Sequence, residues 1–494
     1  MDERLARLDR AFNPRSIAFV GATEAAAKWG FIIFNNLIVG GYTGRLYPVN
    51  PGRDQVLGMQ AYRSVRDIPG DVDLAVLTVP ARNVVGAMED CASKGVRAAV
   101  VVSAGFKELG GESALMEAEL VRIADAAGIA VVGPNGQGIC CPKSGLYSWM
   151  PLFYPPTGSV GVVCQSGNIL NMVIGHVIDA GFGLSKAVSS GNEAQLKTED
   201  YIEYLAHDPD TQVIAAYIEG VEDGRRFLEK ARRATRSKPV VVLKGGRSES
   251  GSAAARSHTG SMAVGERMFE SACRQAGVVL TRTIRETGLT AASFVNRPLP
   301  RGRRVGIVTG GGGLGVIAAD ACSEEGLEVV HLSKETLEEV GRLLPGWWVP
   351  GNPIDLVAGL DLTIIGPILE TLIESGEVDS LLLIFVEAPR TKTPVDPNTV
   401  KGLDISAVWD AMTQLAADHI SGLYDTMHEK QLPLYVVSNF TTGRGIGRKL
   451  AAGERQVMIY SDVEAACGAL SSMVRYYEYL RDDGALPEGG VSSP

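Results

Sequence analysis

The sequence contains no uninterrupted apolar stretch long enough to span a bilayer. It also has no runs of basic residues, and its 57 Asp and Glu outnumber its 47 Lys and Arg, for a net charge of −10. Because nucleic acids and anionic membranes attract basic surfaces, we expect neither as a partner, although a local basic pocket for a phosphorylated ligand is compatible with this balance. The charged N-terminus, MDERLARLDRAFNP, has no apolar signal core behind it, so we expect a cytoplasmic protein.

Cysteine patterns that would build a disulfide framework or a metal centre are also missing. The 7 Cys are scattered, with no CxxC pair and no Cys/His spacing of the kind that holds zinc. The remaining composition, 45% hydrophobic and 21% charged with 58 Gly and 24 Pro, is that of a globular protein. At 494 residues, the chain is expected to hold about three domains.

Short β-branched runs alternate with longer amphipathic segments, which predicts βαβ units and parallel sheets. The runs are continuous rather than alternating, so we expect both faces of each sheet to be buried. The predicted strands form three groups: 16–21, 45–50, 73–80, 97–105 and 130–135; then 159–167, 184–192, 213–220, 239–246 and 278–282; then 305–313, 327–332, 380–389 and 433–439.

We therefore predict three tandem doubly wound α/β domains. Two proline-bearing segments, CPKSGLYSWMPLFYPPTG and VNRPLPRGRR, mark the boundaries between them. The predicted divisions are a first domain at 1–140, a linker at 141–158, a second domain at 159–298, a third domain at 303–480 and a disordered tail at 481–494.

The first candidate site is Gly21-Ala22-Thr23, directly after a predicted strand. Glycine permits a tight strand-to-helix turn that leaves backbone amides free to meet a phosphate. The next strand ends in Asn50-Pro51-Gly52-Arg53, without the acidic residue that would hold the ribose of a nicotinamide cofactor. This favours a ligand with an additional phosphate, such as coenzyme A, although a simple turn remains an alternative.

Ligands of open α/β sheets bind at the carboxyl edge of the strands, so the loops after the later strands are candidates by position. The residues concerned are Val79, Pro80, Ser103, Ala104, Gly105 and Asn135.

A second strand–glycine–helix turn is Gln165-Ser166-Gly167-Asn168. The free amides and the dipole at a helix N-terminus would stabilise a phosphoryl group. Ordinary helix capping by the serine or the asparagine is the alternative.

The third candidate is His258, within the Gly-, Ser- and Ala-rich stretch GGRSESGSAAARSHTGSMAVG. A neutral imidazole can attack phosphorus if an acceptor holds its other ring nitrogen. Glu219, at the end of a predicted strand, is a plausible acceptor; an ordinary surface histidine is the alternative. Two further features, the GGGGLG motif at 310–315 and the pair Trp347-Trp348, are compatible with a tight turn, core packing or an interface.

Nearly the whole chain resembles one family, the α subunits of ADP-forming (NDP-forming) acyl-CoA synthetases of the succinyl-CoA synthetase superfamily. The stretches that carry this resemblance are VGAT, RLYPVNP, DLAVLTVPA, VVVSAGFKE, GPNGQGI, VGVVCQSGN, VIAAYIEGVEDGRRF, VVLKGGRSESG and, above all, RSHTGSMA.

The resemblance implies a Rossmann-like CoA-binding domain followed by two flavodoxin-like domains. It implies that His258 carries a phosphoryl group, that Glu219 orients its imidazole, and that Ser166, Gly167 and Asn168 bind phosphate. Asn171 falls where the succinate enzymes carry a substrate-contacting Tyr, so we expect a different acid.

The activity implied is reversible ligation of a small carboxylic acid to coenzyme A through an acyl phosphate, coupled to ATP/ADP and Mg²⁺. The nucleotide would bind an ATP-grasp domain on a separate β subunit, giving an α/β hetero-oligomer. Gly136 departs from the family pattern after GPN, where relatives often have Cys, and the bulkier Ile169 and Leu170 depart from it near the acid pocket. A catalytically silent CoA-binding protein and a pyridine-nucleotide dehydrogenase are the alternative functions.

Overall fold

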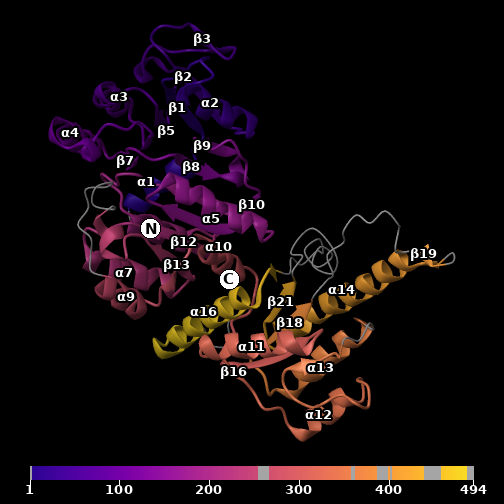
Figure 1. The fold of residues 1–494 in the computed structure, drawn as a ribbon. Coiled ribbons are helices and arrows are strands. Elements are labelled where there is room, and N and C mark those ends of the chain that lie inside the picture. The colour runs from indigo at the N-terminus through magenta and orange to yellow at the C-terminus, as the bar shows by residue number, and fades with distance from the viewer. Residues whose placement is uncertain are drawn as a thin grey trace. The chain divides into compact units, whose positions relative to one another are not determined.

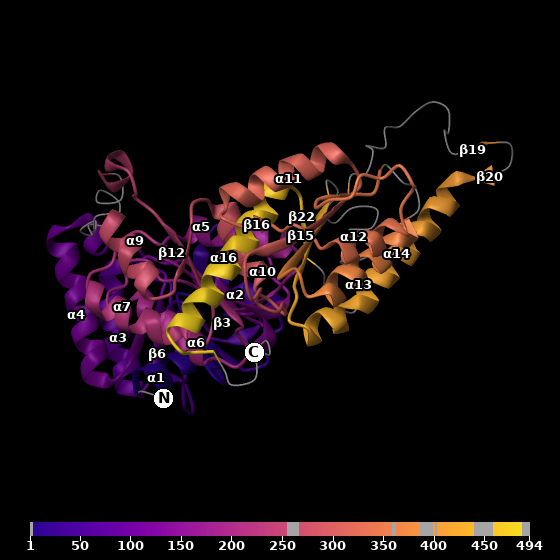
Figure 2. The same cartoon turned by 90° about the horizontal axis from the view of Figure 1, so that it is seen from below.

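The computed structural model describes residues 3–253, 266–357, 362–385, 399–400, 403–438 and 458–486 (Figures 1 and 2). The chain divides into two compact units. One unit comprises Met1–Ile178 and Phe182–Ala291, and the other comprises Asp179–Gly181 and Ala292–Pro494. The first two predicted domains therefore form one compact unit.

The first sheet has five parallel strands in the order β2-β1-β5-β6-β7, and the residues of its central strands are buried. Helices α3 and α4 end at Gly95 and Gly128, both in the left-handed conformation that glycine favours. The elements of this region are α1 (Glu3–Phe12), β1 (Ser16–Val20), α2 (Trp29–Val39), β2 (Arg45–Val49), β3 (Gln55–Val56), β4 (Met59–Gln60), η1 (Val65–Asp67), β5 (Leu74–Leu77), α3 (Ala81–Lys94), β6 (Ala98–Val101), η2 (Lys107–Leu109), α4 (Gly111–Ala127) and β7 (Ala130–Val132).

The second sheet has seven strands in the order β14-β13-β12-β10-β11-β8-β9, of which β8 and β9 are antiparallel additions. Its elements are β8 (Gly138–Cys141), η3 (Pro142–Ser144), β9 (Leu146–Trp149), β10 (Thr157–Cys164), α5 (Gly167–Asp179), β11 (Leu184–Ser189), α6 (Thr198–His207), β12 (Val213–Ile218), α7 (Gly224–Thr235), β13 (Val240–Lys244), α9 (Glu266–Gln275), β14 (Val279–Thr281) and α10 (Ile284–Ser293).

The segment 141–158, which we predicted to be a linker, forms regular secondary structure in the first unit. It supplies the tight turn η3, the strand β9 and the start of β10. All four residues of β9 are buried, because Tyr147 and Trp149 pack inside the unit while the strand pairs with β8. Of the prolines that suggested a linker, Pro142 lies in η3 and the others follow β9, so none of them removes a hydrogen-bond donor from that strand.

The third sheet, in the second unit, has the order β16-β15-β18-β21-β22, with β17 beside β15. Helices α11 and α16 lie side by side in both views (Figures 1 and 2). The elements are β15 (Arg304–Thr309), α11 (Gly312–Glu324), β16 (Glu328–Val329), α12 (Lys334–Gly341), β17 (Ile354–Asp355), η4 (Leu362–Ile364), α13 (Ile365–Ser375), β18 (Ser380–Phe385), β19 (Thr399–Val400), β20 (Leu403–Asp404), α14 (Ile405–Glu429), β21 (Leu434–Ser438), β22 (Ile459–Tyr460) and α16 (Val463–Asp482).

The predicted doubly wound architecture is confirmed. In each sheet the first strand of the group lies between the second and the third, so each sheet has the same order and its own switch point between the first and third strands. Of the predicted tail, residues 481–482 belong to α16, and 487–494 lie outside the described residues.

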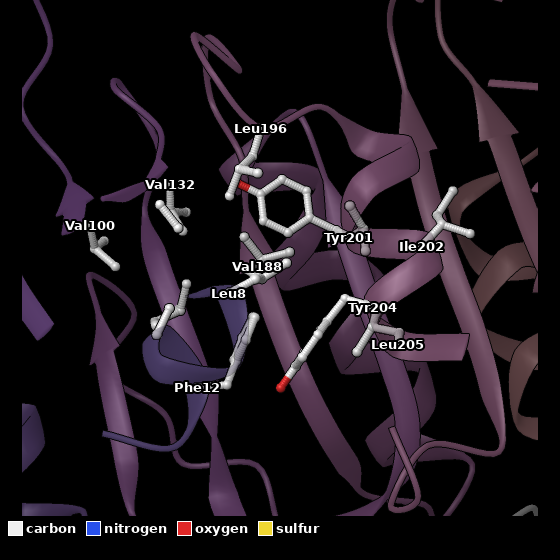
Figure 3. Packing of buried hydrophobic residues seen from close by; sticks show 14 of the residues in the cluster. Leu8, Phe12, Val100, Val132, Val188, Leu196, Tyr201, Ile202, Tyr204 and Leu205 are labelled. Atoms are coloured by element: carbon white, nitrogen blue, oxygen red, sulfur yellow. The ribbon is translucent and has the colours of Figure 1, made fainter. Parts of the chain in front are cut away.

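The N-terminal helix α1 helps to join the first two sheets into one core. It contacts β6 and β7 of the first sheet and also α6. Leu8 and Phe12 are fully buried, and Figure 3 shows Leu8 beside Val188 of the second sheet and Phe12 beside Tyr204 of α6. The rings of Phe12 and Tyr204 stack with centroids 5.3 Å apart, and the Tyr204 hydroxyl donates to Asp9 at 2.9 Å.

Within the described ranges, no helix combines the length and the apolar character needed to cross a membrane. All seven cysteines are buried free thiols.

Candidate functional site

A cavity of about 850 Å³ lies in the first unit, among the loops that follow β1, β5, β6 and β7 of the first sheet and β10 and β11 of the second. It therefore includes the switch point of the first sheet, between β1 and β5, where open α/β sheets bind ligands. Of the predicted site residues, those that line the cavity are Gly21, Thr23, Asn50, Val79, Pro80, Ser103, Ala104, Asn135, Gln165, Ser166, Gly167 and Asn168.

The turn after β1 depends on glycine. Gly21 has a φ of +97°, and a Cβ there would lie 2.6 Å from Oγ1 of Thr78. A Cβ on Gly30, in the first turn of α2, would lie 2.2 Å from the carbonyl oxygen of Gly21. Lys28, which precedes α2, supplies no side-chain cap, so the helix N-terminus approaches the loop with its first amides uncapped by that residue.

Asn50 fastens this turn to the end of β2. Its Nδ2 donates to the carbonyl of Ala22 at 2.8 Å, and its Oδ1 accepts the amide proton of Gly52 at 2.9 Å. Arg53, which we predicted for the additional phosphate, instead pairs with Glu24 at 3.0 Å on the surface. Among the described site candidates, Ala22, Pro51, Arg53, Gly105, Asn171 and Glu219 are not part of the cavity lining.

The loops after β5, β6 and β7 are tied to one another. Ser103 Oγ donates to the carbonyl of Val79 at 2.5 Å, and its own carbonyl accepts the amide proton of Asn135 at 3.0 Å. Asn135 has a φ of +60°, and Gly105 donates its amide proton to Glu108 at 2.6 Å. These contacts hold the lining from the first sheet in one fixed arrangement.

The second-sheet side of the cavity is the turn that starts α5. Ser166, Gly167 and Asn168 bring the helix N-terminus to the cavity. A Cβ on Gly167 would lie 2.3 Å from Cδ of Gln137, so the glycine lets that side chain lie against the helix. Gln165 Nε2 donates to Glu193 at 3.0 Å. Burial raises the pKa of the Glu193 carboxyl, although hydrogen bonds from Thr198, Ser190 and Gln165 oppose the rise.

Glu219 follows β12 and is buried, with 8% of its surface exposed. Burial raises the pKa of the Tyr217 hydroxyl, and the Glu219 carboxylate, to which this hydroxyl is hydrogen-bonded, raises it further. Lys244 Nζ donates to the backbone carbonyl of Glu219 at 2.7 Å; burial lowers the pKa of this amine. Tyr217 and Lys244 also line a second cavity of about 590 Å³. His258 lies outside the described residues, so its predicted pairing with Glu219 stays a prediction.

Several cavity residues were missed by sequence reasoning. Gln137 directly precedes β8, a short strand that no periodicity indicated, and Trp29 begins a helix after an irregular loop. Asn192 also lines the cavity and belongs to the SSGNE stretch after β11. That stretch repeats the strand–glycine pattern of the other candidate sites, so Asn192 could have been predicted from the sequence by the same argument.

Asn171 lies behind the lining. Its Nδ2 donates to Gln137 Oε1 at 3.2 Å, while its Oδ1 is buried and has no hydrogen-bond partner among the residues that the structure describes. In the second unit, the GGGGLG motif at 310–315 forms the turn into α11. The pair Trp347-Trp348 is divided between solvent and core, with exposed fractions of 68% and 9%.

These features define an α/β protein in which two doubly wound sheets share one ligand cavity. Family models match three consecutive regions. A CoA binding domain matches residues 15–142, a succinyl-CoA ligase like flavodoxin domain matches residues 157–294, and a Ligase-CoA domain matches residues 305–396.

Individual relatives agree with the domain matches. The α subunit of ADP-forming acetate–CoA ligase II from Pyrococcus furiosus is 41% identical over 77% of this chain and 82% of its own. The α subunit of ligase I from the same organism is 33% identical over 96% of this chain and 98% of its own. The structure of a dinucleotide-forming acetyl-coenzyme A synthetase 1 from Candidatus Korarchaeum cryptofilum, in complex with phosphate and ADP, superposes with a TM-score of 0.83 at 30% identity, over 96% of this chain and 98% of that chain.

The chain belongs to the family of α subunits of ADP-forming acyl-CoA synthetases. These matches support neither the dehydrogenase nor the silent CoA-binding protein. Several longer relatives, whose names carry no subunit designation, are matched over only 48–55% of their own length.

Proposed function

We propose that this chain carries the CoA, acid and phosphohistidine sites of an ADP-forming acyl-CoA synthetase. The observation that carries the proposal is the shared cavity. Loops of the CoA-binding domain and the N-terminus of α5 face the same space of about 850 Å³. A thiol held by the first sheet and a phosphoryl group held at that helix could therefore meet one acyl group.

On the first-sheet side, Gly21 and Thr23 would receive the phosphates of coenzyme A near the start of α2, while Val79, Ser103 and Asn135 would contact its arm. On the second-sheet side, the amides at Ser166–Asn168 and the dipole of α5 would hold the phosphoryl group. The acid would lie between the two, where Gln137 and Met150 line the cavity.

The chemistry divides into three reversible exchanges. The carboxylate takes the phosphoryl group from phosphorylated His258, giving an acyl phosphate and the free imidazole. The CoA thiolate then attacks the acyl carbon and releases inorganic phosphate, giving the thioester. ATP restores phosphorylated His258 and leaves as ADP. Glu219 would accept a hydrogen bond from the N–H of the other ring nitrogen and so hold the imidazole in the correct tautomer.

We propose that the nucleotide binds an ATP-grasp β subunit, which joins this chain in an α/β hetero-oligomer. Two relatives that match over most of their length are named as α subunits, and the longer relatives extend well beyond the matched region. Mg²⁺, held with the nucleotide, would neutralise charge on the transferred phosphoryl group. Acetate is the first acid to assay, because it is the acid in the names of those relatives.

The test is transfer of label from [γ-³²P]ATP in the presence of a matching β subunit and Mg²⁺. We expect acid-labile, base-stable labelling that disappears in His258→Ala and persists in His331→Ala, a change at an exposed position of the third domain. Label that persists in His258→Ala would remove this residue from the mechanism. A panel of carboxylic acids, assayed for thioester formation with the reconstituted pair, would then identify the substrate; CoA binding without labelling would favour a silent CoA-binding protein.

A further inference from the structure

Asn192 connects the two halves of the cavity through an unusual set of partners. It follows β11 in the second sheet and lines the cavity. Its Nδ2 donates to Glu108 Oε2 at 2.6 Å and to Glu117 Oε2 at 2.9 Å. Both carboxylates come from the first-sheet region, one from η2 and the other from α4.

The two carboxylates are themselves held in place. Glu108 Oε1 accepts the amide proton of Gly105 at 2.6 Å, and Glu117 accepts that of Lys107 at 3.3 Å. Lys107 Nζ lies 3.8 Å from Glu117 and 3.7 Å from Glu222, which adds a positive charge beside the pair. Burial opposes ionisation of Glu108, but hydrogen bonds from Asn192 and Gly105 outweigh it, so the pKa of Glu108 is lowered.

This arrangement determines the orientation of a second amide. Ionised carboxylates only accept hydrogen bonds, so both Nδ2 protons of Asn192 are committed to Glu108 and Glu117. The Oδ1 of Asn192 must then face the other way, where it accepts from Nδ2 of Asn135 at 3.2 Å. With its nitrogen used in this way, Asn135 keeps its side-chain oxygen for another donor.

Asn135 lines the cavity, and its backbone is held by the hydrogen bond to Ser103. We propose that Glu108 and Glu117 are positioning residues that act through Asn192 to direct the side-chain oxygen of Asn135 into the cavity, as the acceptor for a hydrogen-bond donor on the arm of coenzyme A. This inference rests on the proposed CoA site. The donor is either an amide N–H of the pantetheine arm or the terminal S–H.

Binding of CoA to the full chain, measured by calorimetry without a β subunit, tests the positioning role. In Asn192→Asp a third carboxylate faces Glu108 and Glu117, so we expect the Kd for CoA to rise about tenfold or more. Adding Glu108→Gln restores the number of charges in the cluster and supplies an amide that can donate to the new carboxylate. The double variant should recover at least part of the lost affinity, which a purely structural defect would not.

A second ligand identifies the donor. Asn135→Ala should weaken binding of CoA; if the thiol is the donor, desulfo-CoA, which lacks it, should bind wild type and Asn135→Ala alike. If an amide is the donor, both ligands should lose affinity equally in this variant.

The controls separate this inference from the proposed function. Glu119→Ala, on the exposed side of α4 where Glu119 pairs with Arg122, should leave the Kd for CoA unchanged. Melting temperatures identify variants that fail to fold. The single variants Glu108→Gln and Asn135→Ala test the positioning role without adding a charge to the cluster. Failure of the wild-type chain to bind CoA would overturn the proposed CoA site. Wild-type binding with an unchanged Kd in Asn192→Asp or in Asn135→Ala would overturn the positioning role alone.

Discussion

The side-chain oxygen of Gln165 accepts the amide proton of Glu219 at 2.5 Å, so the turn into α5 is joined to the end of the neighbouring strand β12. The same oxygen accepts from the amide of Gly220 at 3.1 Å. Because Gln165 Nε2 donates to the carboxylate of Glu193, the orientation of this amide is determined by a buried acid. Gln165 therefore connects the proposed phosphate site to the proposed partner of His258.

Gln165→Leu should slow phosphorylation of the chain by about tenfold, because the amides of Glu219 and Gly220 lose their acceptor and the strand end that carries the carboxylate is no longer held. The measurement is the rate of labelling by [γ-³²P]ATP with the β subunit. Gln60→Leu, at an exposed position of β4, is the matched control. An unchanged rate in Gln165→Leu would show that this contact does not position Glu219.

Gly167→Ala and Gly175→Ala compare two glycines of the same helix. A Cβ at 167 would lie 2.3 Å from Gln137, whereas within the described part of the chain no atom lies within 4 Å of one at 175. We expect Gly167→Ala to lower the melting temperature, displace Gln137 and weaken phosphate binding. Gly175→Ala should be neutral or stabilising by up to about 1 kcal/mol, since alanine has the higher helix propensity. Thermal unfolding measures the melting temperatures, and calorimetry with inorganic phosphate measures binding. Equal melting temperatures and equal phosphate affinities in the two variants would contradict the close packing of Gln137 against Gly167.

Trp29 should report ligand binding directly. It lines the cavity and is 51% exposed, so a ligand that covers it will change its fluorescence. Titration with CoA should shift or quench the emission of the wild-type chain, and Trp29→Phe should remove most of that change. Trp347→Phe is the control, because Trp347 is exposed but belongs to the second unit. A full signal in Trp29→Phe would place the CoA site elsewhere.

Stability should depend on pH through Glu199. Burial raises the pKa of this carboxyl from 4.5 to about 7, although its ion pair with Arg226, at 2.8 Å, opposes the rise. Between these values the folded chain holds a proton that the unfolded chain has released, so the stabilising contribution is complete below about 4.5 and is lost as pH rises through about 7. Glu199→Gln, which stays neutral, should therefore raise the melting temperature more at pH 8 than at pH 5. Glu119→Gln, at a half-exposed position of α4, is the control, and an equal shift at both pH values would contradict the prediction.

The sequence by itself determined the class of fold and indicated where the candidate site lies. The strands β1, β10 and β15 and the turns that follow them were predictable, because β-branched runs and strand–glycine–helix turns are local patterns. The loops that follow parallel strands lie together at the carboxyl edge of the sheet. Most residues on the predicted list could therefore be assigned to the cavity from the sequence.

Only the tertiary structure decided which distant segments meet. Trp149 looked like part of a linker, and its strand joins the second sheet because a neighbouring strand and a buried space are available there. Arg53 faces Glu24 rather than the cavity, and Asn192 meets Glu108 from 84 positions away in the chain. Such contacts depend on side-chain direction and on long-range packing, and no local periodicity encodes either of them.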